Sequence, residues 1–341
     1  MYDVPIGIVG TGMYLPEQVM TAAEIAEHSG LPEWVIREKF GIEQKHIPGE
    51  DDHPNQMALW AVEDCLARCG AKAEDIDLVI CTTEEWREYL LWTSGIDLAH
   101  RIGAKGAWGV DIHMRCATTL AAMKMAKSLM QTEEEIETVL IAGGYRISDF
   151  INYKNRNTSF MWNIGSGAGA MLLKRNYPRN QILGTHLISD GSMSRDVIIP
   201  ASGTMAFPTD QAVKDGQFMF DLVRPESMKA RLGEVSMANW ETCIDEALRK
   251  SSLTRTDIDL LNMILVKPSA YRDLLERVGL DENQGVYLGH IGHLGEQDSI
   301  ISIIEAERAG KLKDGDVMLM IGAGIGYVWG AGVVRWGQKE D

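Results

Sequence analysis

Two segments of the chain share one pattern of polar and hydrophobic positions. Residues 73–80 follow a helical segment that ends near Gly70, and residues 256–261 follow another that ends near Lys250. In both, a polar turn leads into a strand that is almost wholly apolar, as expected where helices cover both faces of a sheet. The pattern therefore indicates an α/β protein whose chain repeats itself.

A second internal similarity concerns glycine-rich turns. Residues 165–173 read Gly-Ser-Gly-Ala-Gly-Ala-Met-Leu-Leu, and residues 322–326 read Gly-Ala-Gly-Ile-Gly before another apolar strand. Each half thus ends in a glycine turn and a strand. We predict two α/β halves, residues 1–176 and residues 177–341, packed face to face. Loop-like material at residues 189–221 is then an insertion in the second half.

The same patterning puts Cys116 at the opening of a helix. Residues 109–113 read as the end of a buried strand, and residues 116–130 read as a helix that is apolar on most of its faces. The unpaired amide hydrogens and the helix dipole favour thiolate over thiol there, and Arg115 adds charge of the same sign. Cys116 is therefore a candidate nucleophile for a thioester, although a single cysteine in an apolar stretch is also typical of a small core residue.

Composition narrows the function classes. The chain has 341 residues, of which 45% are hydrophobic and 24% charged, and this suits one large domain or two similar halves. A net charge of -16 without a basic run argues against nucleic acid or an anionic membrane surface as the main partner. The amino terminus lacks the regions of a signal peptide, and five cysteines show no recurring close spacing, which predicts a cytoplasmic protein without a metal site.

Two glycine-containing segments have alternative interpretations. The uncharged residues 317–334 have the length of a membrane span, but their five glycines favour two buried strands joined by a close turn. Residues 10–15 begin like a dinucleotide fingerprint but lack its third glycine and its acidic residue, which argues against a nicotinamide cofactor.

Several motifs occur in a characteristic order along nearly the whole chain. They are residues 10–18, Glu33 with Trp34, residues 40–42, Cys116 in its strand-to-helix setting, residues 167–170, residues 185–191, Gly315 with Asp316, and residues 327–330. Together they resemble the β-ketoacyl-acyl carrier protein synthase III family of the thiolase superfamily. The resemblance implies a duplicated five-layered αβαβα thiolase fold that transfers an acyl group through a cysteine, usually as a homodimer.

The resemblance also assigns expected roles. Cys116 would accept the acyl group from acyl-coenzyme A or an acyl-carrier protein, with no permanently bound cofactor. The main-chain N–H groups of Cys116 and Gly326 would form the oxyanion hole. Trp34 and Arg156 would hold the adenine of coenzyme A between them. Tyr89 matches the position that the dimer partner lends to the acyl pocket. The glutamates and arginine around it indicate either a polar or short acyl group or a charged edge at a subunit boundary.

The chain departs from the family at two positions. Decarboxylating members use a histidine and an asparagine to stabilise an enolate. Residues 262–270 contain no histidine, so the first position falls on Ile264 or, at the end of the strand, on Lys267. The second position falls on His293, in a Gly-His-Leu-Gly string that resembles the histidine segment of thiolases, with His290 three residues earlier as a further candidate. A histidine there could exchange a proton with the Cys116 thiol.

We therefore expect an acyltransferase that acylates Cys116 and forms or cleaves a carbon–carbon bond without decarboxylation. Acyl transfer to an oxygen, nitrogen or aromatic carbon, ordinary decarboxylative synthesis, and a catalytically silent scaffold for a second thiolase-like subunit stay open as alternatives. The sequence does not name the acyl group or the acceptor.

Overall fold

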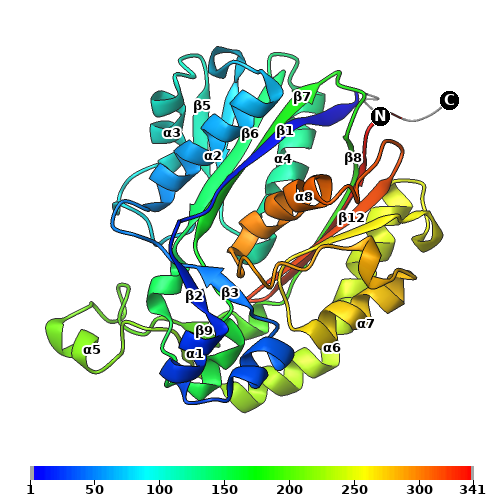
Figure 1. Ribbon diagram of the computed structural model, residues 1–341. Coiled ribbons are helices and arrows are strands. Elements are labelled where there is room, and N and C mark those ends of the chain that lie inside the picture. Colours follow the sequence, from blue (N-terminus) through cyan, green and yellow to red (C-terminus); the bar gives the residue numbers. More distant parts are fainter. Residues whose placement is uncertain (1–3, 339–341) are drawn as a thin grey trace.

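A single mixed sheet of nine strands forms the centre of the protein. The computed structural model describes residues 4–338 (Figure 1). The strands follow the order β11-β12-β13-β8-β1-β7-β6-β4-β5 across the sheet. Only one residue pair, Gly7 with Gln181, joins β1 to β8, so the sheet consists of two groups of strands that meet at a narrow junction.

The two groups repeat one order of pairings. The first contains β1 (Ile6–Tyr14), β4 (Leu78–Cys81), β5 (Trp108–Asp111), β6 (Thr138–Tyr145) and β7 (Gly167–Arg175). The second contains β8 (Gln181–Ser189), β11 (Leu260–Met263), β12 (Val317–Gly324) and β13 (Val328–Arg335). The parallel pair β4 and β6 corresponds to β11 and β12, and β7 and β1 correspond to β13 and β8. The division of the chain at residue 176 stays a prediction.

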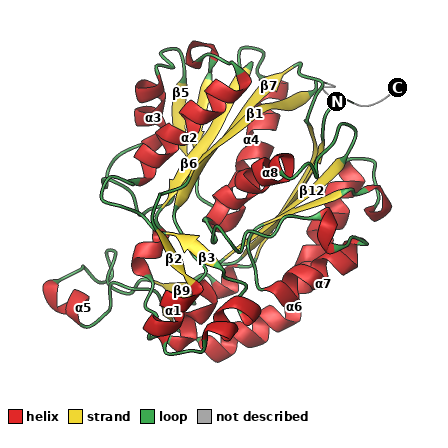
Figure 2. Ribbon diagram, in the orientation of Figure 1, coloured by secondary structure: helices red, strands yellow, loops and turns green. Residues whose placement is uncertain are grey.

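Helices cover both faces of each group of strands (Figure 2). Between the groups lie α4 (Thr118–Thr132) and α8 (Asp298–Arg308), which contact strands of both. The outer face of the first group is covered by α2 (Pro54–Cys69) and α3 (Ser94–Ile102), and that of the second by α6 (Pro225–Lys250) and α7 (Pro268–Val278). The expected five-layered αβαβα thiolase fold is therefore confirmed.

The central layer explains the hydrophobic pattern of its helices. In α4, Leu120, Met123, Ala126 and Met130 are all completely buried. A helix between two sheets buries most of its surface, and this is why the sequence of α4 is apolar on most sides. Its exposed residues are Lys124, Met125, Ser128 and Thr132. The uncharged residues 317–334 form the antiparallel strands β12 and β13, as the sequence predicts. No helix within residues 4–338 has the length and apolar character that crossing a membrane requires.

Shorter elements extend from this framework. The remaining strands and helices are β2 (Val19–Thr21), β3 (Gln44–His46), β9 (Val197–Ile198), β10 (Asp221–Leu222), α1 (Ala22–Ser29) and α5 (Asp210–Lys214). Short helical segments are η1 (Val35–Lys39), η2 (Ala73–Asp75), η3 (Arg115–Ala117), η4 (Ile147–Phe150), η5 (Arg156–Met161), η6 (Gly191–Met193), η7 (Arg255–Asp257), η8 (Glu282–Gln284) and η9 (Gly295–Gln297). Figure 1 shows α5 on an arm that projects from the body of the molecule.

Candidate active site

Cys116 lies in a tight turn at the entrance to the central helix. The chain leaves β5, forms η3, and enters α4 at Thr118, so the cysteine precedes the helix instead of opening it. The Thr118 hydroxyl donates to the Arg115 carbonyl oxygen at 2.6 Å and accepts from the Met114 amide at 2.7 Å. These two bonds fix the turn, and with it the direction of the Cys116 side chain.

The Cys116 thiol is the first member of a buried chain of three side chains. Its Sγ lies 3.2 Å from His293 Nε2, and His293 Nδ1 lies 2.6 Å from Asp298 Oδ2. Asp298 is completely buried, and His293 is only 8% exposed. This is the arrangement of a nucleophile, a base and a carboxylate that orients the base. The sequence predicted the first two members of the chain and missed Asp298.

Asp298 is held rigidly by the main chain around it. Its Oδ2 also accepts from the Leu265 amide at 2.8 Å, and its Oδ1 accepts from the Leu294 amide at 2.7 Å. Because Asp298 begins α8 and Leu265 follows β11, the carboxylate joins the central layer to the second group of strands. His293 therefore meets an acceptor whose position is already fixed.

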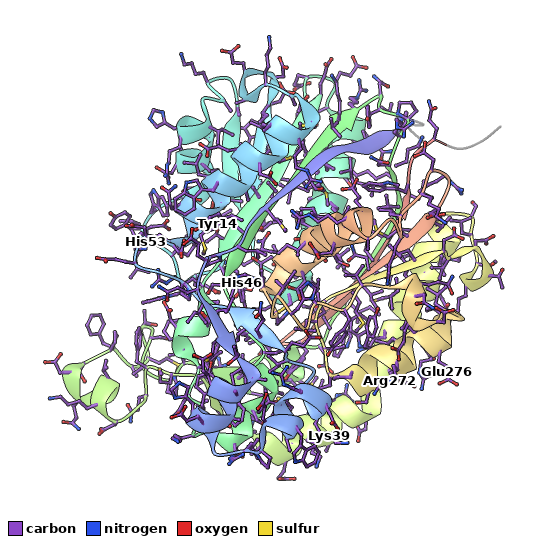
Figure 3. The ribbon with its side chains drawn as sticks, in the orientation of Figure 1. Tyr14, Lys39, His46, His53, Arg272 and Glu276 are labelled. Atoms are coloured by element: carbon purple, nitrogen blue, oxygen red, sulfur yellow. The ribbon has the colours of Figure 1, made fainter. Side chains whose placement is uncertain are left out.

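The loop that carries His293 is held on two sides. The His293 amide donates to the Asn163 carbonyl oxygen at 2.7 Å, and the Gly165 amide donates to the His293 carbonyl oxygen at 2.9 Å. Strand β3 lies on the other side, where the His46 amide donates to the Ile291 carbonyl oxygen at 3.0 Å. Figure 3 labels His46 within this strand. The histidine thus depends on contacts between segments far apart in the sequence.

The electrostatics of the pair differ from the sequence-based expectation. Burial raises the pKa of the Cys116 thiol, and the His293 charge opposes that rise. Although burial opposes a positive charge on His293, Asp298 and Cys116 hold the pKa of the imidazole well above its usual range. Arg115 does not serve the thiolate, because its guanidinium binds Glu84 at 3.3 Å and Glu85 at 2.6 Å. Thiolate formation thus depends on His293 keeping the proton.

A large cavity of about 1910 Å³ contains the cysteine and the histidine. Aromatic side chains contribute much of its wall, among them Phe150, Phe160, Phe218, Trp240 and Trp329. Five cationic residues also line it. Arg87 and Arg115 are paired with carboxylates, whereas Arg156, Lys229 and Lys267 form no ion pair among the described residues. The cavity therefore combines a broad apolar surface with positive charge, which suits a ligand that has both an apolar part and phosphate groups.

The candidates for the missing histidine position do not contact the cysteine pair. Ile264 is 4% exposed and lines the cavity as an apolar wall residue. Lys267 lies at the start of α7 with its Nζ 5.7 Å from the centre of the Phe40 ring. His290 does not line the cavity; its Nε2 lies 3.5 Å from Glu305 Oε2, and about half of its side chain is exposed. The structure thus brings His293, and not His290, to Cys116.

The expected coenzyme A residues lie in one region. The Arg156 guanidinium packs over the Trp162 ring at 5.8 Å and donates to the Ser29 carbonyl oxygen at 2.9 Å, at the end of α1. Trp34 follows shortly after this helix and is 54% exposed, so its ring face is free for a ligand. Arg156 is therefore stacked on Trp162 and lines the cavity, whereas Trp34 is not among the lining residues.

The glycine-rich end of β12 packs directly on Cys116. A side-chain carbon at Gly324 would lie 2.9 Å from the Cys116 nitrogen, and one at Gly322 would lie 3.0 Å from its carbonyl oxygen. Only glycine allows this close approach. Gly326, the expected oxyanion-hole residue, is not among the residues that line the cavity, whereas Gly324 is.

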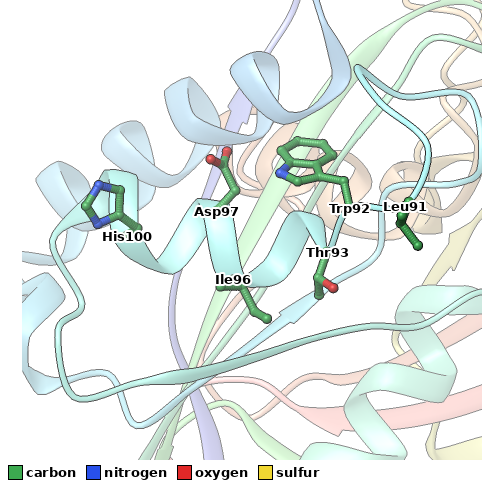
Figure 4. A pocket seen from close by; sticks show the side chains of 6 residues that line it. All are labelled: Leu91, Trp92, Thr93, Ile96, Asp97 and His100. Carbon is green, nitrogen blue, oxygen red and sulfur yellow. The ribbon is translucent and has the colours of Figure 1, made fainter.

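The segment around Tyr89 forms the rim of the cavity and an exposed surface. Tyr89 lines the cavity with 69% of its surface exposed, and Leu90 and Leu91 are almost fully exposed. A separate groove of about 570 Å³ lies beside this segment at the start of α3 (Figure 4). Its lining residues are Leu91, Trp92, Thr93, Ile96, Asp97 and His100. An apolar surface next to the edge strand β5 is typical of a subunit boundary.

Comparison with known families covers both halves of the chain. The family model for 3-oxoacyl-[acyl-carrier-protein (ACP)] synthase III matches residues 110–191, and its C-terminal counterpart matches residues 248–336. Together the two matches cover about half of the chain. The first contains Cys116, and the second contains His293 and Asp298.

Individual relatives match over nearly the full length. The β-ketoacyl-[acyl-carrier-protein] synthase III of Desulfitobacterium hafniense is 27% identical over 340 residues, 98% of this chain and 99% of the relative. That of Geobacillus kaustophilus is 28% identical over 337 residues, 97% of this chain and 99% of the relative. The solved Thermus thermophilus synthase III superposes with a TM-score of 0.81 at 25% identity, covering 97% of this chain and 99% of that one.

Proposed function

This chain belongs to the 3-oxoacyl-[acyl-carrier-protein] synthase III family of thiolase-superfamily condensing enzymes, and on that premise we propose that it transfers an acyl group through Cys116 to a carbon acceptor without decarboxylation. The observation that carries the proposal is the buried chain from Cys116 through His293 to Asp298. It supplies a nucleophile and one proton carrier, which is what thioester exchange requires.

In the first step, Cys116 takes the acyl group from a thioester. His293 Nε2 accepts the thiol proton, and the thiolate attacks the carbonyl carbon. The carbon–sulfur bond to the donor then breaks, and the leaving thiolate takes the proton from His293. Asp298 stabilises the imidazolium that exists between these two proton transfers. The main-chain N–H of Cys116 and one from the glycine turn at residues 322–326 would bind the oxyanion.

The second step is inferred from the absence of the histidine and asparagine that decarboxylating members of the family use as donors. Loss of carbon dioxide leaves an enolate that needs hydrogen-bond donors beside it. Ile264 has none to offer, and Lys267 packs its ammonium group on the Phe40 ring. His293 alone then has to act both as proton carrier and as enolate donor. A carbon acceptor that is not carboxylated, as in the thiolase reaction, fits this site better.

The donor is proposed to be acyl-coenzyme A or an acyl-carrier protein. The cationic lining of the cavity and the exposed ring of Trp34 suit a phosphorylated nucleotide and its pantetheine arm. The relatives named above are synthases whose names include the acyl-carrier protein. We also propose a homodimer, because β5 is an edge strand and the neighbouring Leu90 and Leu91 are exposed.

Intact-protein mass spectrometry tests the first step. The purified protein is mixed with acetyl-, butyryl-, octanoyl- and phenylacetyl-coenzyme A, and the expected product is a covalent acyl adduct on Cys116. The adduct should be absent from Cys116→Ala. Cys69→Ala is the matched control, because a hydrogen bond with Cys65 lowers the pKa of Cys69 to about 6 and makes it the competing reactive thiol. If no thioester labels the protein, a silent scaffold replaces this proposal.

A further inference from the structure

Two buried carboxyl groups beside Cys116 take no part in the steps described so far. Glu84 follows β4 and is 4% exposed, and Glu296 lies in η9 and is completely buried. Each keeps one oxygen without any hydrogen-bond partner within the described structure, Oε1 of Glu84 and Oε2 of Glu296. Burying a carboxyl oxygen without a partner is costly, so such atoms call for a functional explanation.

The two glutamates are connected through their neighbours. Gln297 Nε2 donates to Glu296 Oε1 at 2.8 Å and to Thr82 Oγ1 at 2.9 Å, which joins η9 to the loop that carries Glu84. Thr119, at the start of α4, donates its hydroxyl to the Glu296 carbonyl oxygen at 2.7 Å. These bonds fix both acids next to the turn of Cys116.

One negative charge is stabilised in this pair, and it lies on Glu84. Arg115 Nη1 lies 3.3 Å from Glu84 Oε2, whereas no cation pairs with Glu296 among the described residues. Burial raises the pKa of both groups, and the charge on Glu84 raises that of Glu296 further. Glu296 therefore holds a proton more firmly than Glu84, whose carboxylate is paired with Arg115.

Only Glu84 of the two lines the cavity, together with Cys116 and His293. Glu84 thus borders the same cavity as the nucleophile, and its free oxygen is buried beside that cavity. Its neighbour Glu85 binds the same Arg115, but more than half of its side chain is exposed. A purely structural partner for Arg115 is therefore already present in Glu85, and it would not require a second, buried carboxylate.

We propose that Glu84 is the base that removes a proton from the carbon next to the carbonyl of the acceptor thioester. This inference rests on the proposed function, because it assigns the step that a carbon acceptor needs. The acceptor C–H bond breaks and its proton goes to Glu84. The electron pair forms the new carbon–carbon bond to the acyl carbonyl carbon. The bond from that carbon to Cys116 Sγ breaks and leaves a thiolate. Glu84 then releases its proton to solvent and His293 takes one up from solvent, which restores the starting proton count at Cys116 and His293. In the cleavage direction Glu84 returns the proton to carbon.

This assignment separates the two proton transfers of the reaction. His293 serves sulfur, which it contacts at 3.2 Å, and Glu84 serves carbon from another strand. A carbon acid needs a base that is desolvated and fixed in place, and burial beside Arg115 meets both conditions. The acceptor class that follows is a thioester with at least one hydrogen on the carbon next to the carbonyl.

Exchange of that hydrogen with solvent tests the proposal without any need for the cysteine. Acetyl-, octanoyl- and phenylacetyl-coenzyme A are incubated in D₂O with the Cys116→Ala protein, and deuterium in the recovered thioester is measured by mass spectrometry. We expect exchange with at least one of the three. Adding Glu84→Gln should slow it by about 10²–10⁴-fold, the usual effect of losing a general base. Glu84→Asp should restore part of it.

Glu85→Gln is the matched control, since it removes the other carboxylate on Arg115 and should change the exchange rate less than about threefold, as expected for a group outside the proton transfer. Thermal unfolding of each variant shows that the fold is retained. Glu84→Gln with an intact cysteine should still form the Cys116 adduct. Equal exchange in Glu84→Gln and Glu85→Gln, or no exchange with any of the three thioesters, overturns the role of Glu84. If the adduct is absent but exchange still depends on Glu84, the proposed cysteine chemistry is overturned and this inference stands.

Discussion

Replacing Asp298 by asparagine removes the charge that supports His293 while keeping the size of the side chain. Asp298 accepts three hydrogen bonds, from His293 and Leu265 on Oδ2 and from Leu294 on Oδ1. An asparagine has one acceptor oxygen. With that oxygen in the place of Oδ2, the bonds to His293 and Leu265 persist, and the Leu294 amide faces an NH₂ group. The opposite orientation leaves the donors of His293 and Leu265 unpaired, so we expect the orientation with the oxygen in the place of Oδ2.

The size of the effect follows from these contacts. One buried amide without an acceptor costs about 1–3 kcal/mol of unfolding free energy. The bond to His293 also loses its ionic character, which is worth about 1.5–3 kcal/mol to the imidazolium. Asp298 raises the pKa of His293, so its loss lowers that pKa and reduces the population of the thiolate–imidazolium pair. At about 1.4 kcal/mol per tenfold change, Cys116 should become roughly 10- to 100-fold less reactive near neutral pH.

Two assays separate these effects. The rate of Cys116 alkylation by iodoacetamide at neutral pH reports the thiolate, and thermal unfolding reports stability. Asp196→Asn is the control, because Asp196 is 1% exposed and bonded to Arg224 at 2.6 Å but has no contact with His293. We expect both variants to lose stability and only Asp298→Asn to lose thiol reactivity. An unchanged alkylation rate in Asp298→Asn would show that the carboxylate has a structural role alone.

Three further predictions concern the base, the reaction and the assembly. His293→Ala should slow acylation of Cys116 by about 10²–10⁴-fold and His290→Ala far less, because His293 is the histidine that contacts the thiol. Single-turnover mass spectrometry measures both rates, and equal small effects would show that His293 is not the base. With malonyl-coenzyme A and an acyl primer, labelled carbon dioxide should be released no faster than by Cys116→Ala, and robust release coupled to a β-ketoacyl product would restore the decarboxylative reaction. Light scattering at micromolar concentration should give the mass of a dimer, because β5 is an open sheet edge beside exposed Trp108 and Ile96. A monomeric mass would contradict pairing of β5 with a second copy of the chain.

The fold could be predicted from the sequence because its signals are local. Polar turns precede apolar strands, and residues 116–130 form a helix that is apolar on most of its faces. Each of these segments shows its own burial in its own sequence. The position of Cys116 follows from the same kind of signal, since the cysteine stands between a strand and a helix. His293 follows from the resemblance of its Gly-His-Leu-Gly string to the histidine segment of thiolases.

The remaining parts of the site depend on contacts between distant segments. Asp298 reads as an ordinary acidic residue at a helix start, and only the fold shows that it joins the Leu265 amide to His293. His290 and His293 both follow a glycine; the resemblance favours His293, and the structure buries His293 and leaves about half of the His290 side chain exposed. The helix dipole and Arg115 predict a thiolate at Cys116, but Glu84 and Glu85 bind this guanidinium and burial raises the pKa of the thiol.

The central claim is that an acyl group on Cys116 is passed to a carbon that carries no carboxylate. The direct test isolates the protein with a carbon-13-labelled octanoyl group on Cys116 and adds unlabelled acetyl-coenzyme A in a single turnover. We predict that the adduct disappears as a labelled 3-oxoacyl-coenzyme A forms in equal amount, without carbon dioxide, in the wild-type protein and not in Cys116→Ala. Discharge of the adduct only to water, an amine or an alcohol, or a 3-oxoacyl product formed only when malonyl-coenzyme A is present, would contradict it.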